Sequence, residues 1–278
     1  MWKTVWKIVA FILNRMFPPV PPPPPEVSDA SELPEEAGVV TTVAAAKAEV
    51  PKTATPHVLI ILDPGHGPAT QGKKSPPLPD GTRFFEYQFN WNVADMAMSL
   101  IEDSGYDVRC THHEWARRHP DMPMGNSLSF RTTVANEWWR EVRATHGGLA
   151  KAYFISIHSN AAPTTEPDGW CDPSIKGVET WYYHYSQASQ QLAQLCHGVL
   201  VEQVVPLLET KDRGLKSTPD IRRSFYVLRE TAMPATLLEI GFYNNAEEVL
   251  KLRDPDIQYA IAKAIATIIH KLNNNDHV

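Results

Sequence analysis

Hydrophobic and polar positions follow two alternating patterns from Val58 onward. Short apolar runs at 58–62 and 152–157 have the length of buried strands. Between them, segment 86–103 repeats apolar residues at steps of three and four, which predicts an amphipathic helix with Phe89, Val93, Met96 and Leu100 on its buried face. Strands and helices that alternate in this way indicate βαβ units and a largely parallel sheet.

The same patterns assign the rest of this region. Strands are predicted at 106–110, 178–183, 225–228 and 235–238, and helices at 130–142, 187–208 and, in one or two pieces, 247–272. We find no internal repeat and no second group of core-forming segments. The sequence therefore predicts one α/β domain at 57–278, with a twisted, largely parallel central sheet flanked by helices.

The first 56 residues differ in composition from this domain. Residues 18–56 contain the run PPVPPPPPEV, then acidic and alanine-rich stretches with almost no large apolar residues, which is typical of a disordered linker. Residues 1–17 repeat tryptophan and aliphatic residues at helical spacing, with Lys3, Lys7 and Arg15 as their only charges. This pattern predicts a short amphipathic helix.

The N-terminal helix has several alternative roles. Its unbroken apolar core is far shorter than the roughly 20 residues that span a bilayer. A basic helix that bears tryptophans can lie on a membrane surface or dock into the groove of a protein partner. The alternatives are an inert terminus or a leader, although prolines stand where a signal peptide has its small-residue cleavage site.

Charge and cysteine content narrow the function classes. The formal net charge of −6 argues against a nucleic-acid partner, which is usually met by a basic face. Cys110, Cys171 and Cys196 are scattered and form no C-x-x-C pair, so the spacing predicts neither a disulfide framework nor a thiolate zinc site. The adjacent pair His112 and His113 could bind a metal ion adventitiously.

Three strand-like runs end on a residue with metal-binding or acid–base chemistry. VLIILDPGHG leads to His66, AYFISIHSNA carries His158, and PATLLEIGFYNN carries Glu239. In open α/β sheets the carboxyl ends of parallel strands meet at one edge, where ligand sites lie. We therefore expect these three side chains to share a site, as in a hydrolase with a single zinc ion.

The first of these runs ends in a loop suited to a site. The glycines and the proline of DPGHG allow a sharp turn after the strand, and Asp63 is placed to bind a ring nitrogen or a backbone amide. Catalytic zinc commonly takes three protein ligands and leaves one position open. Glu86, at the start of the predicted helix, is the candidate third ligand beside His66 and His158, although a carboxylate there also suits a helix N-terminus.

Glu239 has the surroundings of a catalytic base. It lies between two apolar runs, and poor solvation raises a carboxyl pKa towards the value that a general base needs. The alternative is a structural ion pair with an arginine at a strand end.

The ordered motifs resemble those of the zinc-dependent N-acetylmuramoyl-L-alanine amidases with an amidase-3 type catalytic domain. They are DPGHG at 63–67, Glu86 at a helix start, SIHSNA at 156–161, GVETWYY at 177–183, DRGLK at 212–216 and PATLLEIGFYNN at 234–245. Leu128, Arg131 and Ala135-Asn136 also match. The resemblance covers 57–272. It implies one zinc ion held by His66, Glu86 and His158, with Glu239 as the catalytic carboxylate.

The resemblance also implies a substrate and a location. The substrate is peptidoglycan, cut at the amide between N-acetylmuramic acid and L-alanine of the stem peptide. Asn160, Arg213 and Lys216 are candidate substrate contacts, although a solvated turn explains DRGLK equally well. The protein is expected in the cell envelope, on the periplasmic or extracellular side, or as a phage enzyme acting on the host wall.

Some segments and functions stay open beside this resemblance. The segments after DPGHG, at 112–124 and at 170–173 depart from the family pattern and are expected to be loops at the rim of the site. The alternative functions are a zinc peptidase that cuts within the stem peptide and a non-catalytic wall-binding protein on the same fold.

Overall fold

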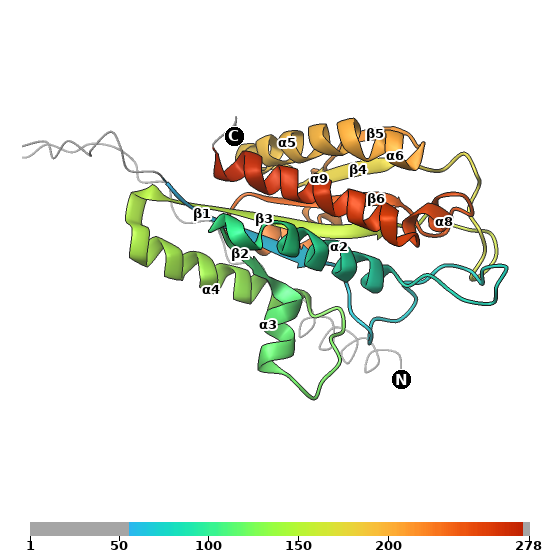
Figure 1. Ribbon diagram of the computed structural model, residues 1–278, viewed down its shortest axis with the longest axis horizontal. Helices are drawn as coiled ribbons and strands as arrows, with labels where there is room; N and C mark the ends of the chain where they lie inside the picture. Colours follow the sequence, from blue (N-terminus) through green and yellow to red (C-terminus); the bar gives the residue numbers. More distant parts are fainter. Residues whose placement is uncertain (1–55, 275–278) are drawn as a thin grey trace, which may run out of the picture. The chain divides into compact units, whose positions relative to one another are not determined.

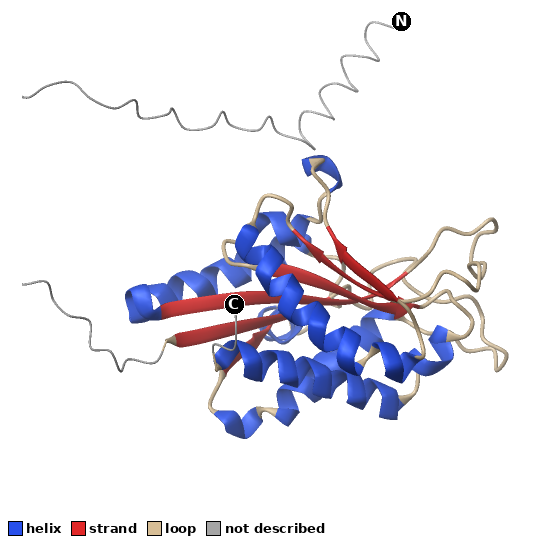
Figure 2. Ribbon diagram, turned by 90° about the horizontal axis from the view of Figure 1, so that it is seen from above, coloured by secondary structure: helices blue, strands red, loops and turns tan. Residues whose placement is uncertain are grey.

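The computed structural model describes residues 56–274, which contain a six-stranded mixed sheet with helices on both faces (Figure 2). The strands, in the order β2-β1-β3-β6-β4-β5, are β1 His57–Pro64, β2 Asp107–Cys110, β3 Ala150–Asn160, β4 Val178–Tyr182, β5 Asp212–Lys216 and β6 Ala235–Phe242. Strands β2, β1, β3 and β6 are parallel to one another, whereas β4 pairs antiparallel with β6 and parallel with β5. The predicted α/β domain with a largely parallel sheet is confirmed.

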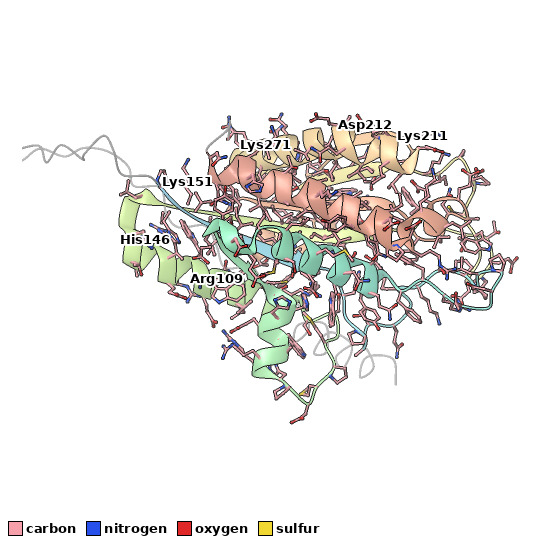
Figure 3. The ribbon with its side chains drawn as sticks, in the orientation of Figure 1. Arg109, His146, Lys151, Lys211, Asp212 and Lys271 are labelled. Carbon is pink, nitrogen blue, oxygen red and sulfur yellow. The ribbon has the colours of Figure 1, made fainter. Side chains whose placement is uncertain are left out.

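Two layers of helices bury the two faces of the sheet (Figure 1). One apolar cluster joins the sheet to α2 Glu86–Leu100, α5 Gln187–Gln203 and α9 Pro255–Asn273; the other joins it to α4 Leu128–His146 and α7 Tyr226–Glu230. Successive side chains of β1 point to opposite faces of the sheet, so Ile60 packs in the first cluster, and Leu59 and Ile61 pack in the second. Exposed polar side chains, such as Lys211 and Asp212 near the start of β5 and His146 at the end of α4, lie around the outside (Figure 3).

Several short elements complete the domain. They are the helices α3 Thr111–Arg118, α6 Val205–Leu208 and α8 Glu248–Leu252, and the 3-10 turns Glu102–Ser104, Gly147–Leu149 and Ile221–Arg223. Prolines explain two of the breaks, since Pro206 lies in the first turn of α6 and Pro255 begins α9. No helix within residues 56–274 has the length and apolar character needed to cross a membrane.

Three local predictions were wrong. Segment 225–228 leads into α7, which begins at Tyr226, rather than forming a strand. Four apolar residues do not distinguish a strand from a helix, and Val227 and Leu228 bury equally well from a short helix. The segment 112–124 was expected to be a loop, but its first residues, up to Arg118, belong to helix α3. In this helix Glu114 pairs with Arg117 and Arg118 one turn later. The solvated turn considered for DRGLK is the edge strand β5.

The N-terminal predictions lie almost wholly outside the described residues. This holds for the amphipathic helix at 1–17 and for the linker at 18–56, of which only Pro56 is described.

Candidate active site

The turn after β1 presents His66 at the carboxyl edge of the sheet. The Gly65 amide donates to the Ile157 carbonyl on β3 at 2.8 Å, which holds the turn against the neighbouring strand. His66 itself has a φ of 63°, in the left-handed region that residues other than glycine rarely adopt. Such a conformation costs about 1–3 kcal/mol and persists only where surrounding contacts enforce it.

Arg131 on α4 supplies those contacts. Its side chain is 2% exposed and donates to the carbonyl oxygens of Pro64 and His66, each at 2.7 Å. It also forms a buried ion pair with Asp63 at 2.8 Å. Asp63 accepts further hydrogen bonds from Thr111 at 2.7 Å and Ser156 at 2.8 Å. The expectation that Asp63 binds a ring nitrogen or backbone amide was wrong, because this arginine and two hydroxyls use its oxygens.

His66, Glu86 and His158 come together, as predicted from their places in the sequence. The Glu86 carboxylate lies between the two rings, with Oε2 at 3.3 Å from Nε2 of His66 and Oε1 at 3.0 Å from Nδ1 of His158. One ligand-type atom from each of the three residues lies within 4.8 Å of the others. Gly65 permits this approach, because a Cβ atom there would overlap the His158 ring.

The ionisation of these groups suits a metal ion. Burial lowers the pKa of His158 and so favours the neutral ring that binds metals. Burial opposes the charge on Glu86, but hydrogen bonds with His158 and His66 outweigh it and lower the pKa to about 2. Nδ1 of His66 is buried and has no hydrogen-bond partner. Two imidazoles and one carboxylate are also a donor set of catalytic zinc, so the residues fit the ion that the sequence predicted.

Glu239 lies beside this cluster, inside β6 rather than at its end. It is paired in register with His158 of β3 on one side and Glu179 of β4 on the other. The strand continues past Glu239 because β4 pairs with Ile240, and Asn160 of β3 pairs with Phe242. Burial first, and then the nearby charges of Glu86 and Glu179, raise the pKa of Glu239 well above 4.5. Its Oε2 atom is buried without a hydrogen-bond partner.

Glu179 is a buried carboxylate that sequence reasoning did not single out. Its Oε1 accepts from Asn160 at 2.8 Å and from Trp181 at 3.1 Å, and its Oε2 accepts from Arg213 at 2.9 Å. The signal available in the sequence was a charged residue inside the strand predicted at 178–183. In the structure its neighbours Val178 and Thr180 are buried with it.

A cavity of about 330 Å³ opens over these groups. Its lining includes the three ligand-type residues, Glu239 and Asn160, together with Lys73, Arg131, Phe225, Tyr226 and Tyr243. Arg213 and Lys216 are not among the lining residues: Arg213 pairs with Glu179, and Lys216 ends β5. The structure therefore places one of the three predicted substrate contacts, Asn160, in the cavity wall.

Two histidines from the ends of parallel strands, a glutamate from the start of a helix and a second, buried carboxylate beside them form a site typical of metal-dependent hydrolases. The family model described as N-acetylmuramoyl-L-alanine amidase matches residues 60–271, and the chain belongs to this family. The resemblance seen in the sequence motifs is thereby confirmed.

Individual relatives agree with this assignment. The N-acetylmuramoyl-L-alanine amidase CwlM of Bacillus licheniformis is 28% identical over 209 residues, which make up 75% of this chain. The chain spans 66% of that relative, slightly less than two thirds of its length.

Solved structures share the fold. The catalytic domain of CwlV, an N-acetylmuramoyl-L-alanine amidase from Bacillus (Paenibacillus) polymyxa var. colistinus, matches with a TM-score of 0.55 and 27% identity, covering 80% of this chain and 99% of that domain. The amidase AmiC2 of Nostoc punctiforme matches with a TM-score of 0.56 and 25% identity, covering 78% of this chain and 98% of the other.

Proposed function

We propose that residues 57–278 form a zinc-dependent peptidoglycan amidase that cuts the amide between N-acetylmuramic acid and L-alanine of the stem peptide. The observation that carries this proposal is the grouping of His66, Glu86 and His158 beside the buried carboxylate of Glu239. Membership of the amidase family supports the choice of substrate.

We propose that His66, Glu86 and His158 hold the catalytic zinc ion. When bound, zinc in such a site polarises a carbonyl group and makes water more acidic. The chain contributes the rigid placement of the ligands: the Arg131 guanidinium holds the His66 backbone, and the β3 ladder holds His158. Both histidines are mostly buried, with side-chain exposures of 11% and 15%, so little reorganisation accompanies binding.

Glu239 is proposed to move the proton. As a carboxylate it accepts a proton from the attacking water, and as an acid it returns this proton to the departing alanine nitrogen. Burial, and then the charges of Glu86 and Glu179, raise the pKa of Glu239, which favours its taking up a proton from water.

One proposed substrate contact lies in the cavity wall, and two further residues lie outside the cavity lining. Asn160 lies in the cavity wall. Its Nδ2 donates to Glu179 and its Oδ1 accepts from the Ala161 amide, so the side chain is held at both ends and can offer its second amide hydrogen or second lone pair to the glycan–peptide junction. Arg213 is proposed to act indirectly: it pairs with Glu179, and the Glu179 carboxylate in turn accepts the hydrogen bond that orients Asn160. Lys216 ends the edge strand β5 outside the cavity lining, and we propose that it contacts a carboxylate farther along the stem peptide.

The proposed substrate sets the place of action. We propose that the protein works at the wall, in the cell envelope or as a phage enzyme acting on a host wall. The N-terminal residues 1–17 are proposed to attach the enzyme to a membrane surface or to a protein partner there.

Product analysis tests the function. Purified peptidoglycan is digested with the full-length chain, with and without a chelator, and the soluble products are separated and sequenced by mass spectrometry. We expect intact stem peptides with a free L-alanine amino terminus, and their loss in the presence of chelator. Cuts within the stem peptide would identify a peptidase instead, and an undigested wall would leave only a binding function.

A further inference from the structure

A second group of metal-binding side chains lies where β2 meets α3, outside the proposed active site. Cys110 is the last residue of β2, and His112 and His113 stand in the first turn of α3. One ligand-type atom from each lies within 4.8 Å of the others. Cys110 and His112 are buried, whereas the His113 side chain is 49% exposed.

Asp95 on α2 fixes the orientation of both rings. Its Oδ1 lies 3.3 Å from Nε2 of His112 and 2.9 Å from Nε2 of His113. On the other side of its ring, His112 places Nδ1 at 3.0 Å from the Cys110 sulfur. A carboxylate that holds one ring nitrogen of a histidine and leaves the other for a metal ion is the usual arrangement behind metal-binding histidines.

Stacking and charge support the same arrangement. The Trp91 ring packs on His112 at 4.6 Å, nearly parallel, which holds that ring in place. Burial opposes the negative charge of Asp95, but hydrogen bonds from His112 and His113 lower its pKa, so it is a carboxylate at neutral pH. One thiolate, one carboxylate and two neutral rings together balance a doubly charged cation.

In the metal-free protein the protonation of Cys110 opposes metal binding. Burial raises the pKa of the Cys110 thiol, although the backbone amides of His112 and His113 partly oppose this. The thiol is therefore protonated at neutral pH, and binding must release its proton, as is usual for cysteine ligands. An adjoining cavity of about 400 Å³, lined by Asp95 and His113 among others, gives an ion a route from solvent.

We propose that Cys110, His112 and His113 bind a second zinc-type divalent ion, with Asp95 as the carboxylate that orients both rings. Mixed thiolate and imidazole ligands favour zinc over magnesium or calcium. The ion ties the start of α3 to α2. Thr111, between these ligands, donates to Asp63 at 2.7 Å, so the site also supports the base of the His66 loop. This inference is independent of the proposed amidase function, because the two sites share no ligand.

Cobalt substitution separates the two sites. The full-length chain is stripped of metal and titrated with Co²⁺ while absorbance is recorded, because only a thiolate ligand gives a sulfur-to-cobalt charge-transfer band in the near ultraviolet. We expect two bound ions per chain, one of which produces this band. Glu86→Gln should lose the other ion and keep the band, since His66, Glu86 and His158 provide no sulfur.

Two variants and one control decide the assignment. Cys110→Ser should abolish the band and reduce the stoichiometry to one ion, whereas Cys196→Ser, at a buried cysteine outside the group, should change neither. His113→Gln alters a half-exposed ring without touching the core and should weaken the band-forming ion about 10- to 100-fold. A single bound ion without the band, or a band that survives Cys110→Ser, would overturn the proposal.

Discussion

Replacing Arg131 by methionine tests how the site loop is held. The substitution keeps much of the side-chain volume and removes the guanidinium that pairs with Asp63. The Asp63 carboxylate then stays buried without its counter-charge, which costs about 3–5 kcal/mol in the free energy of unfolding. Three carbonyl oxygens, those of Pro64, His66 and Asn126, lose a charged donor as well.

Urea unfolding of the metal-free protein, followed by circular dichroism, measures this cost. A loss of about 3–5 kcal/mol corresponds to a fall in Tm of roughly 6–20 °C for a domain of this size. The matched control is Arg222→Met, because that arginine is 92% exposed beside Asp220 and should change the free energy of unfolding by less than about 0.5 kcal/mol. A loss below about 1 kcal/mol for Arg131→Met would refute the argument that this ion pair holds the loop.

Two further perturbations address the metal ligands and the buried base. Gly65→Ala should reduce zinc affinity at least about tenfold, because the new methyl group overlaps the His158 ring. Competition with a chelating dye measures this affinity. Gly148→Ala, whose methyl group meets no atom within 4 Å, is the control. Metal-free protein should lose stability as pH rises from about 4.5 towards the raised pKa of Glu239, because the folded state binds that proton more tightly than the unfolded state. Chemical denaturation from pH 4 to 8 should therefore show Glu239→Gln as the more stable protein at neutral pH, and a steeper loss in the variant would contradict this sign.

The sequence predicted those parts of the site that local pattern determines. His66 and His158 follow apolar runs whose length identifies buried strands, and β1 and β3 do bring them to one edge of the sheet. Glu86 was predictable because it opens the helix that follows the loop after β1. In each case, a short stretch of chain contains the physical reason for the placement.

Features that depend on pairing between distant segments were missed or misjudged. Glu239 was expected at the end of a strand, but the antiparallel ladder from β4 continues past it and sets Glu179 directly opposite. The direction and register of β4 depend on how the chain returns through α5 and β5, which no local pattern records. Arg131 matched a helix motif, yet its buried ion pair with Asp63 joins residues 68 positions apart.

The central claim is that Glu239 performs proton transfer beside a metal ion that other residues hold. The most direct measurement compares Glu239→Gln with the unmodified protein for release of stem peptides from purified peptidoglycan and for bound zinc. We predict a rate reduced about 10²- to 10⁴-fold, with zinc content unchanged. Zinc retained together with a rate within about tenfold of the unmodified protein would contradict the account.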